Sequence, residues 1–126
     1  MSSFVDSNVM IYAFTNNDRK EECRSFLSQE NLVTNTLVLL ESYAKISTIN
    51  SEEYSANAIK GVLGLGNITI VDFTSNLLFE SLRRSQKYAL KISDLVHFTT
   101  ALLNNCSQMI SYDKHFDGLE ITRSEP

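Results

Sequence analysis

Four acidic side chains stand out because the residues around them are apolar or because they close an expected structural element: Asp6, Glu41, Asp94 and Asp113. An unpaired carboxylate in apolar surroundings is costly and tends to be neutralised. Clustered carboxylates also repel one another unless a cation binds among them. Oxygen ligands suit hard cations, so the set predicts bound Mg²⁺ or Mn²⁺. One or two such ions can activate water and stabilise the leaving oxygen when a phosphodiester is cleaved.

Two of these acids follow segments that have the pattern of buried strands. Asp6 comes directly after residues 3–5, and Asp113 comes directly after residues 109–112. In open parallel α/β sheets, ligands bind beyond the carboxyl ends of the strands. Both carboxylates are therefore expected at the same edge of a sheet.

The other two acids belong to predicted helices. Glu41 lies within residues 37–49, and its neighbours at i−4 and i+3 are apolar, so it shares a helix face with apolar side chains. Asp94 follows Ser93, the expected N-cap, at the start of a helix over residues 94–105. An acid in a first helical turn is often structural, because it interacts favourably with the helix dipole. The functional interpretation therefore rests on the four acids as a set.

The rest of the chain alternates between strand and helix patterns, with Ser7 or Asn8 expected to cap the first helix and Thr36 the third. This alternation predicts a three-layer α/β/α domain with a mostly parallel central sheet of four to five strands, and one domain over residues 1–126. The expected strands are 3–5, 32–34, 68–71, 109–112 and 119–121, and the expected helices are 9–14, 18–29, 37–49, 52–63, 75–89 and 94–105.

The segments around the acids resemble the PIN domain family. Phe-Val-Asp6-Ser-Asn8 is similar to the opening of PIN domains, where a strand ends in an aspartate followed by a small hydroxyl residue and an asparagine. Leu-Leu-Glu41-Ser-Tyr is similar to the second, helix-borne acid, and Ile-Ser-Asp94-Leu-Val-His to the helix of the third. Met-Ile-Ser111-Tyr-Asp113 resembles the closing strand and its acid. The pieces occur in the family's order and span the chain.

The resemblance implies an Mg²⁺- or Mn²⁺-dependent endoribonuclease, most like the VapC-type toxins of prokaryotic toxin–antitoxin pairs. Such toxins are often homodimers held inactive by an antitoxin, and the helices at 37–49 and 52–63 are candidates for the dimer interface. By the same resemblance Asn8 helps to order the site and Ser111 supports it with its hydroxyl group. Asp117 is a candidate accessory acid, or only caps the turn at Gly118.

The charge balance is unusual for a protein that binds nucleic acid. The net charge is −4, which the four singled-out acids would account for by themselves, and bound divalent cations would cancel much of it. The densest basic run is a candidate phosphate-binding rim or an ordinary solvated helix face, and both interpretations stay open: Arg83, Arg84, Lys87 and Lys91. Arg19 alternates with acids, which favours a solvated face.

Two rival functions share the α/β pattern. One is a non-catalytic PIN-like module that binds RNA or a protein, which the complete acidic set argues against. The other is a receiver-like signalling domain, for which Asp72 is the nearest phosphoacceptor candidate, without the paired acids that such domains carry. His97 lies one turn after Asp94, so it could hydrogen-bond that acid or line the cleft, although a partly buried structural histidine is favoured.

The sequence contains no membrane or export signal. The residues after Met1 lack the basic start of a signal peptide, and no apolar run approaches the ~20 residues that span a bilayer. Cys23 and Cys106 are far apart and are expected to be reduced thiols. These features predict a soluble cytoplasmic protein.

Overall fold

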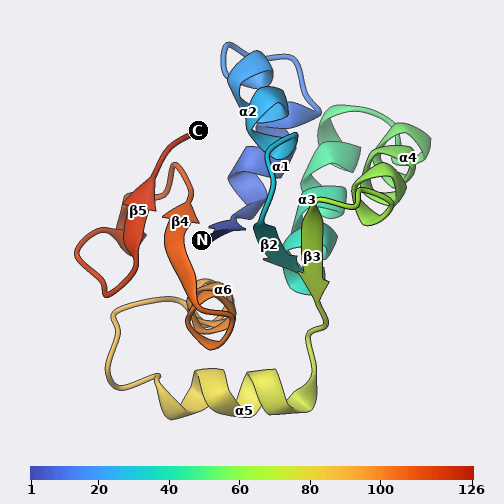
Figure 1. Ribbon diagram of the computed structural model, residues 1–126. Coiled ribbons are helices and arrows are strands. Elements are labelled where there is room, and N and C mark those ends of the chain that lie inside the picture. Colours follow the sequence, from blue (N-terminus) through green and yellow to red (C-terminus); the bar gives the residue numbers. More distant parts are fainter.

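The computed structural model describes residues 1–126 and is built around a five-stranded, all-parallel sheet with the order β3-β2-β1-β4-β5. The three-layer prediction is confirmed: α1 to α4 lie on one side of the sheet and α5 with α6 on the other (Figure 1). The strands are β1 (Ser2–Val5), β2 (Leu32–Asn35), β3 (Ile68–Val71), β4 (Cys106–Ile110) and β5 (Thr122–Ser124). The helices are α1 (Ser7–Ala13), α2 (Lys20–Leu27), α3 (Thr36–Ile49), α4 (Glu52–Leu63), α5 (Ser75–Arg83), α6 (Ile92–Leu103) and the 3₁₀ helix η1 (Lys114–Phe116).

The core gathers around the central strand β1. Phe4 and Val5 are fully buried there, and β4 adds Met109 and Ile110 beside them. Helix α6 is buried from Leu95 through to Ala101, since it packs against the sheet and against α5. None of the helices has both the length and the apolar character needed to cross a bilayer.

Two helices begin with caps other than those expected from the sequence. Asp6, rather than Ser7 or Asn8, is the N-cap of α1, and its Oδ1 accepts the backbone N–H of Ser7 at 2.7 Å. Asn35, rather than Thr36, is the N-cap of α3, and its Oδ1 accepts the N–H three residues ahead at 2.7 Å. In both cases the capping residue has an extended backbone and directly follows a strand, so the helix begins at the next residue.

Two elements end or begin elsewhere than expected. Helix α5 stops at Arg83 rather than at residue 89, because Tyr88 leaves the helical path to pack its ring edge-on against Phe98, 5.1 Å between centroids. The last strand lies at 122–124 rather than 119–121. Gly118 has a φ of 77°, so the chain is still turning there before it pairs with β4.

The helix that carries Asp94 and the strand before Asp113 also have other bounds than the sequence predicted. Helix α6 begins at Ile92 after the N-cap residue Lys91, so Ser93 lies inside the first turn instead of capping it. Strand β4 covers 106–110 rather than 109–112. Its last strand residue is therefore Ile110. The backbone N–H of Ser111 still donates to the carbonyl of Ser124 on β5 at 3.0 Å, whereas its hydroxyl bonds to Asp6.

Candidate metal centre

The first acid lies where the two central strands end. Asp6 follows β1, and its backbone N–H donates to the carbonyl of Ile110 on β4 at 3.0 Å. Ser111, the next residue, donates its hydroxyl to Asp6 Oδ2 at 2.7 Å. Both side chains are buried, with Asp6 only 4% exposed. The carboxylate is therefore held at the carboxyl edge of the sheet, where parallel sheets bind ligands.

Ser111 and Asn8 fix the fourth acid relative to the first. The Ser111 hydroxyl accepts the backbone N–H of Asp113 at 3.0 Å and the side-chain amide of Asn8 at 3.1 Å. Asn8 Oδ1 in turn accepts the N–H of Tyr112 at 3.3 Å. The loop after β4 is thus tied to the start of α1 by Asn8 and Ser111, the two side chains to which the resemblance to PIN domains gives supporting roles.

The second acid is joined to α6 by a histidine. Glu41 is half-buried on α3, and its Oε1 lies 2.7 Å from Nε2 of the fully buried His97. His97 is buried, as the favoured interpretation of the sequence expected, but its acidic partner is Glu41 rather than Asp94, the acid one turn earlier on the same helix. The long-range partner could not be recognised from spacing along α6 alone.

The third and fourth acids approach each other at the opening of the site. Asp94, Asp113 and His115 each offer one ligand atom, and these atoms all lie within 4.8 Å of one another. His115 Nδ1 is 3.1 Å from Asp113 Oδ1, and its ring is exposed. The buried Asp94 Oδ2 has no hydrogen-bond partner. The position of His115, two residues after Asp113, is the sequence signal for this contact.

The acids influence one another electrostatically. Burial raises the pKa of Asp6, the charge of Glu41 adds to the rise, and His97 is the largest opposing influence. Burial also raises the pKa of Asp94, and the charges of Asp6 and Asp113 raise it further. Each of the four is therefore linked to at least one other by repulsion, so the site is under strain when all four are ionised.

The residues present fit a divalent cation. Carboxylate oxygens are the donors that Mg²⁺ and Mn²⁺ prefer, and Asp94 and Asp113 supply them beside the imidazole of His115. A buried carboxylate oxygen without a partner, Asp94 Oδ2, is costly unless something binds it. A cation at this point would satisfy that oxygen and remove the repulsion among the acids.

The candidate accessory acid lies in a different environment. Asp117 is 54% exposed, and its Oδ1 accepts a hydrogen bond from Arg123 Nε at 2.6 Å. No hydrogen bond or ion pair joins it to the four central acids. Arg123 also donates to the carbonyl of Ser111 at 3.0 Å. Asp117 therefore contacts the end of β4 only indirectly, through Arg123.

Three members of the basic run are already paired. Arg83 and Arg84 lie 2.8 and 3.6 Å from the carboxylate of Glu80, and Lys87 lies 3.3 Å from that of Glu120. Lys91 makes no ion pair, and its charge is among those that oppose the rise in the pKa of Asp94. Lys91 is thus the member of the run that is electrostatically closest to the acidic site.

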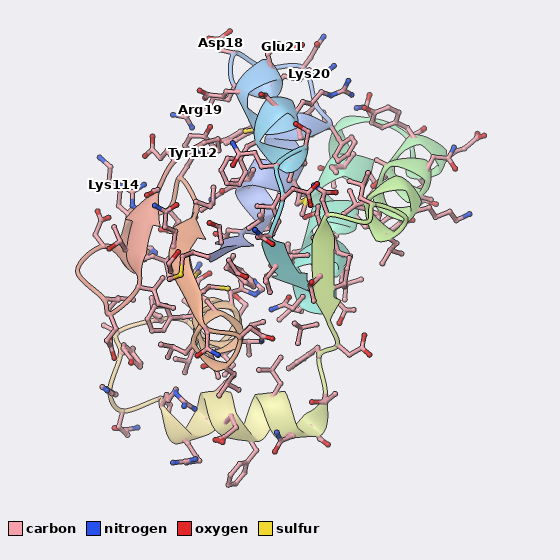
Figure 2. All side chains as sticks on the ribbon, viewed as in Figure 1. Asp18, Arg19, Lys20, Glu21, Tyr112 and Lys114 are labelled. Carbon is pink, nitrogen blue, oxygen red and sulfur yellow. The ribbon has the colours of Figure 1, made fainter.

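One basic residue that the sequence assigns to a solvated helix face instead stacks on an aromatic ring. Arg19, at the start of α2, lies with Cζ 4.2 Å from the centroid of the Tyr112 ring and 5.4 Å from that of Tyr12 (Figure 2). It makes no ion pair. The Tyr112 hydroxyl donates to Glu22 at 2.8 Å, which holds the ring in place. Because Tyr112 immediately precedes Asp113, Arg19 contacts the loop that carries the fourth acid.

Comparison with solved structures shows the same architecture in three bacterial proteins. The Mycobacterium tuberculosis toxin VapC20, described as cleaving the sarcin-ricin loop, has a TM-score of 0.81 at 16% identity, covering 99% of this chain and 100% of its own. A toxin–antitoxin complex from Klebsiella pneumoniae has a TM-score of 0.75 at 17% identity, covering 98% and 97%. VapBC2 from Rickettsia felis, bound to promoter DNA, has a TM-score of 0.70 at 16% identity, covering 99% and 98%.

At these identities the likeness concerns the fold. No curated protein matches the chain significantly. The profile of the PIN domain, however, matches residues 3–121, a stretch that contains all four acids together with Asn8 and Ser111. The chain therefore belongs to the PIN domain family.

Proposed function

We propose that this protein is an endoribonuclease that depends on Mg²⁺ or Mn²⁺ and acts as the toxin of a toxin–antitoxin pair. The observation that carries the proposal is the unpartnered, buried oxygen of Asp94, whose pKa is raised first by burial and then by the charges of Asp6 and Asp113. Such a site is stabilised by a cation and is costly without one. The PIN membership and the VapC-like fold support the same activity.

In this proposal Asp6, Glu41, Asp94 and Asp113 hold one or two ions, with His115 as an additional candidate ligand. When bound, such an ion activates water for attack on the phosphorus and stabilises charge on the leaving oxygen. Ser111 keeps the Asp6 carboxylate in place through its 2.7 Å hydrogen bond.

The chain also offers groups for the RNA backbone. Arg19, stacked on Tyr112, and the unpaired Lys91 carry positive charge on the borders of the acidic site. Phosphate oxygens that approach the metal would meet these cations. Arg83, Arg84 and Lys87 would first have to exchange their carboxylate partners for phosphates, so they are proposed as a secondary rim.

The proposal is tested by incubating purified protein with a panel of structured RNAs, a sarcin-ricin loop among them, with Mg²⁺, with Mn²⁺ or with EDTA. Asp6→Asn should abolish cleavage, because the amide removes a charged ligand yet still caps α1. Asp18→Asn removes an exposed carboxylate outside the site and should cleave like the parent.

Metal-dependent cleavage by Asp6→Asn would contradict the assignment of the site. If neither cleavage nor Mn²⁺ binding is found for the parent protein, the alternative is favoured: a non-catalytic PIN-like module that binds RNA or a protein.

The partners are also proposals. Two of the similar structures are toxin–antitoxin complexes, so we expect a cognate antitoxin that binds and silences this chain. We further expect a homodimer through the outer faces of α3 and α4, where Leu40 and Leu63 remain 63% and 54% exposed. Light scattering after size-exclusion chromatography should give a dimer for the parent and a monomer for Leu40→Lys. A monomeric parent at micromolar concentration would contradict the dimer.

A further inference from the structure

A buried chain of hydrogen bonds leads from the start of α3 to Glu41. Asn35 Oδ1 accepts the N–H of Val38 at 2.7 Å, which settles which end of the amide is the oxygen. The amide nitrogen then faces the hydroxyl of Thr100 at 3.0 Å and Nδ1 of His97 at 3.1 Å. The Thr100 hydroxyl donates its only proton to the carbonyl of Val96, so it acts as an acceptor for the Asn35 amide.

The amide orientation determines the tautomer of His97. Because Asn35 donates from its nitrogen, Nδ1 of His97 must accept, and the ring proton is carried by Nε2. This N–H points at Glu41 Oε1, 2.7 Å away. The ring is 1% exposed and stacked on Phe4, 5.9 Å between centroids, so it has little freedom to turn away.

The hydrogen bond from His97 is the contact that restrains the Glu41 carboxylate. The side chain is long and 32% exposed, and no other hydrogen bond or ion pair restrains its carboxylate. A free glutamate would lose side-chain entropy on binding a metal, which weakens the binding. With Oε1 fixed by His97, the second oxygen is left without a partner.

We propose that His97 is a positioning residue that, held by Asn35, fixes Glu41 as a ligand of the divalent cation. The proposal rests on the metal centre put forward above. Hydrogen bonds from a second layer to metal ligands commonly change metal affinity by about 10–100-fold. His97 would thus raise the affinity of the site for the ion through Glu41 without touching the ion itself.

The test compares two amides at this position by calorimetric titration of the full-length protein with Mn²⁺. In His97→Gln the amide nitrogen reaches the place of Nε2 and can still donate to Glu41. In His97→Asn the amide reaches only the place of Nδ1, so the bond to Glu41 is lost. We expect His97→Asn to bind Mn²⁺ about 10–100-fold more weakly than the parent, and His97→Gln to recover most of that loss.

A double-mutant cycle separates positioning from a general structural effect. If His97 acts through Glu41, adding His97→Asn to Glu41→Gln should weaken Mn²⁺ binding little beyond Glu41→Gln alone. Losses that simply add would overturn the proposal, and so would parent-like Mn²⁺ affinity in His97→Asn. A parent protein that binds no Mn²⁺ would overturn the metal centre itself, which distinguishes the two failures.

If the His97 variants do not fold, NMR of proteins that retain His97 tests the same hydrogen bonds. In ¹⁵N NMR spectra of the metal-free parent, His97 should show a protonated Nε2 and an unprotonated Nδ1. The Nε2 resonance should move in Glu41→Gln, whose amide differs from the carboxylate as an acceptor. A proton on Nδ1, or a resonance unchanged by Glu41→Gln, would contradict the hydrogen-bond chain.

Discussion

Asp6 serves the fold and the site with the same carboxylate. One oxygen caps α1 and the other accepts the Ser111 hydroxyl, so both are bonded even though the group is buried. The position after a strand made Asp6 recognisable from the sequence. Its role as the helix cap was not recognised, because Ser7 and Asn8 are equally good capping residues.

The raised pKa of Asp6 predicts how stability depends on pH in EDTA. Burial, the largest cause, lifts the pKa above its ordinary value of 3.8, so the folded state retains a proton that the unfolded state has already lost. Parent stability relative to Asp6→Asn should therefore fall as pH rises from 3.8 through the raised pKa, and level off above it. Urea unfolding of both proteins across this range measures the difference. A difference that grows in favour of the parent with rising pH would contradict the assigned shift.

Arg19 is expected to contribute to RNA binding rather than to the reaction. Replacing it by Ala removes one cation, so affinity should drop for all RNA sequences alike and the salt dependence should lose about one unit of slope. Arg19→Lys keeps the charge but loses the stacking of the guanidinium group on Tyr112. Its affinity for RNA should therefore lie between those of the parent and Arg19→Ala. Lys20→Ala is the control, because Lys20 makes no such aromatic contact. Binding measured by fluorescence anisotropy that is the same for both alanine variants would refute the role of Arg19.

At the scale of elements, the sequence predicted the existence of the helices and strands better than their ends. The periodic apolar pattern marks the middle of an element, but contacts between distant segments decide where it stops. Helix α5 ends at Arg83 because Tyr88 is drawn into the core against Phe98 and bonds to Glu120. That partner lies far along the chain, so no local pattern could indicate it.

The two capping residues of α3 and α5 should differ in their effect on stability. Thr74 caps α5 through one hydrogen bond to Leu77 N–H at 3.1 Å, so Thr74→Ala should cost about 1 kcal/mol. Asn35 caps α3 and also serves His97 and Thr100 in the core, so Asn35→Ala should cost roughly 2–4 kcal/mol. Chemical denaturation of the two variants makes the comparison. Equal losses would mean that the buried amide acts only as a cap.

At the scale of the whole molecule, the sheet brings together acids that are far apart in sequence. The parallel alternation of strands and helices, and hence the shared carboxyl edge, could be predicted from the sequence. The strand order could not, because β1 pairs with β2 and β4 through contacts between residues such as Ser2 and Cys106. The His97–Glu41 bond could not be predicted for the same reason, because it joins helices on opposite sides of the sheet that are far apart in sequence.

The order of stability of two proteins should reverse when metal is added. In EDTA at neutral pH, Asp6→Asn should be the more stable, because removing a buried, repelled charge while preserving the cap outweighs the lost hydrogen bond from the Ser111 hydroxyl, which an amide nitrogen cannot accept. With Mn²⁺ at about 100 times its Kd, the parent gains about 2.7 kcal/mol by binding, whereas the variant lacks a ligand and gains much less. Thermal unfolding in EDTA and in Mn²⁺ follows both changes, with Asp18→Asn as a control that should behave like the parent. A metal-induced rise in Tm that is equal in the parent and Asp6→Asn would place the bound ion elsewhere. The predicted reversal would tie the stability of the whole fold to the charge of one buried carboxylate.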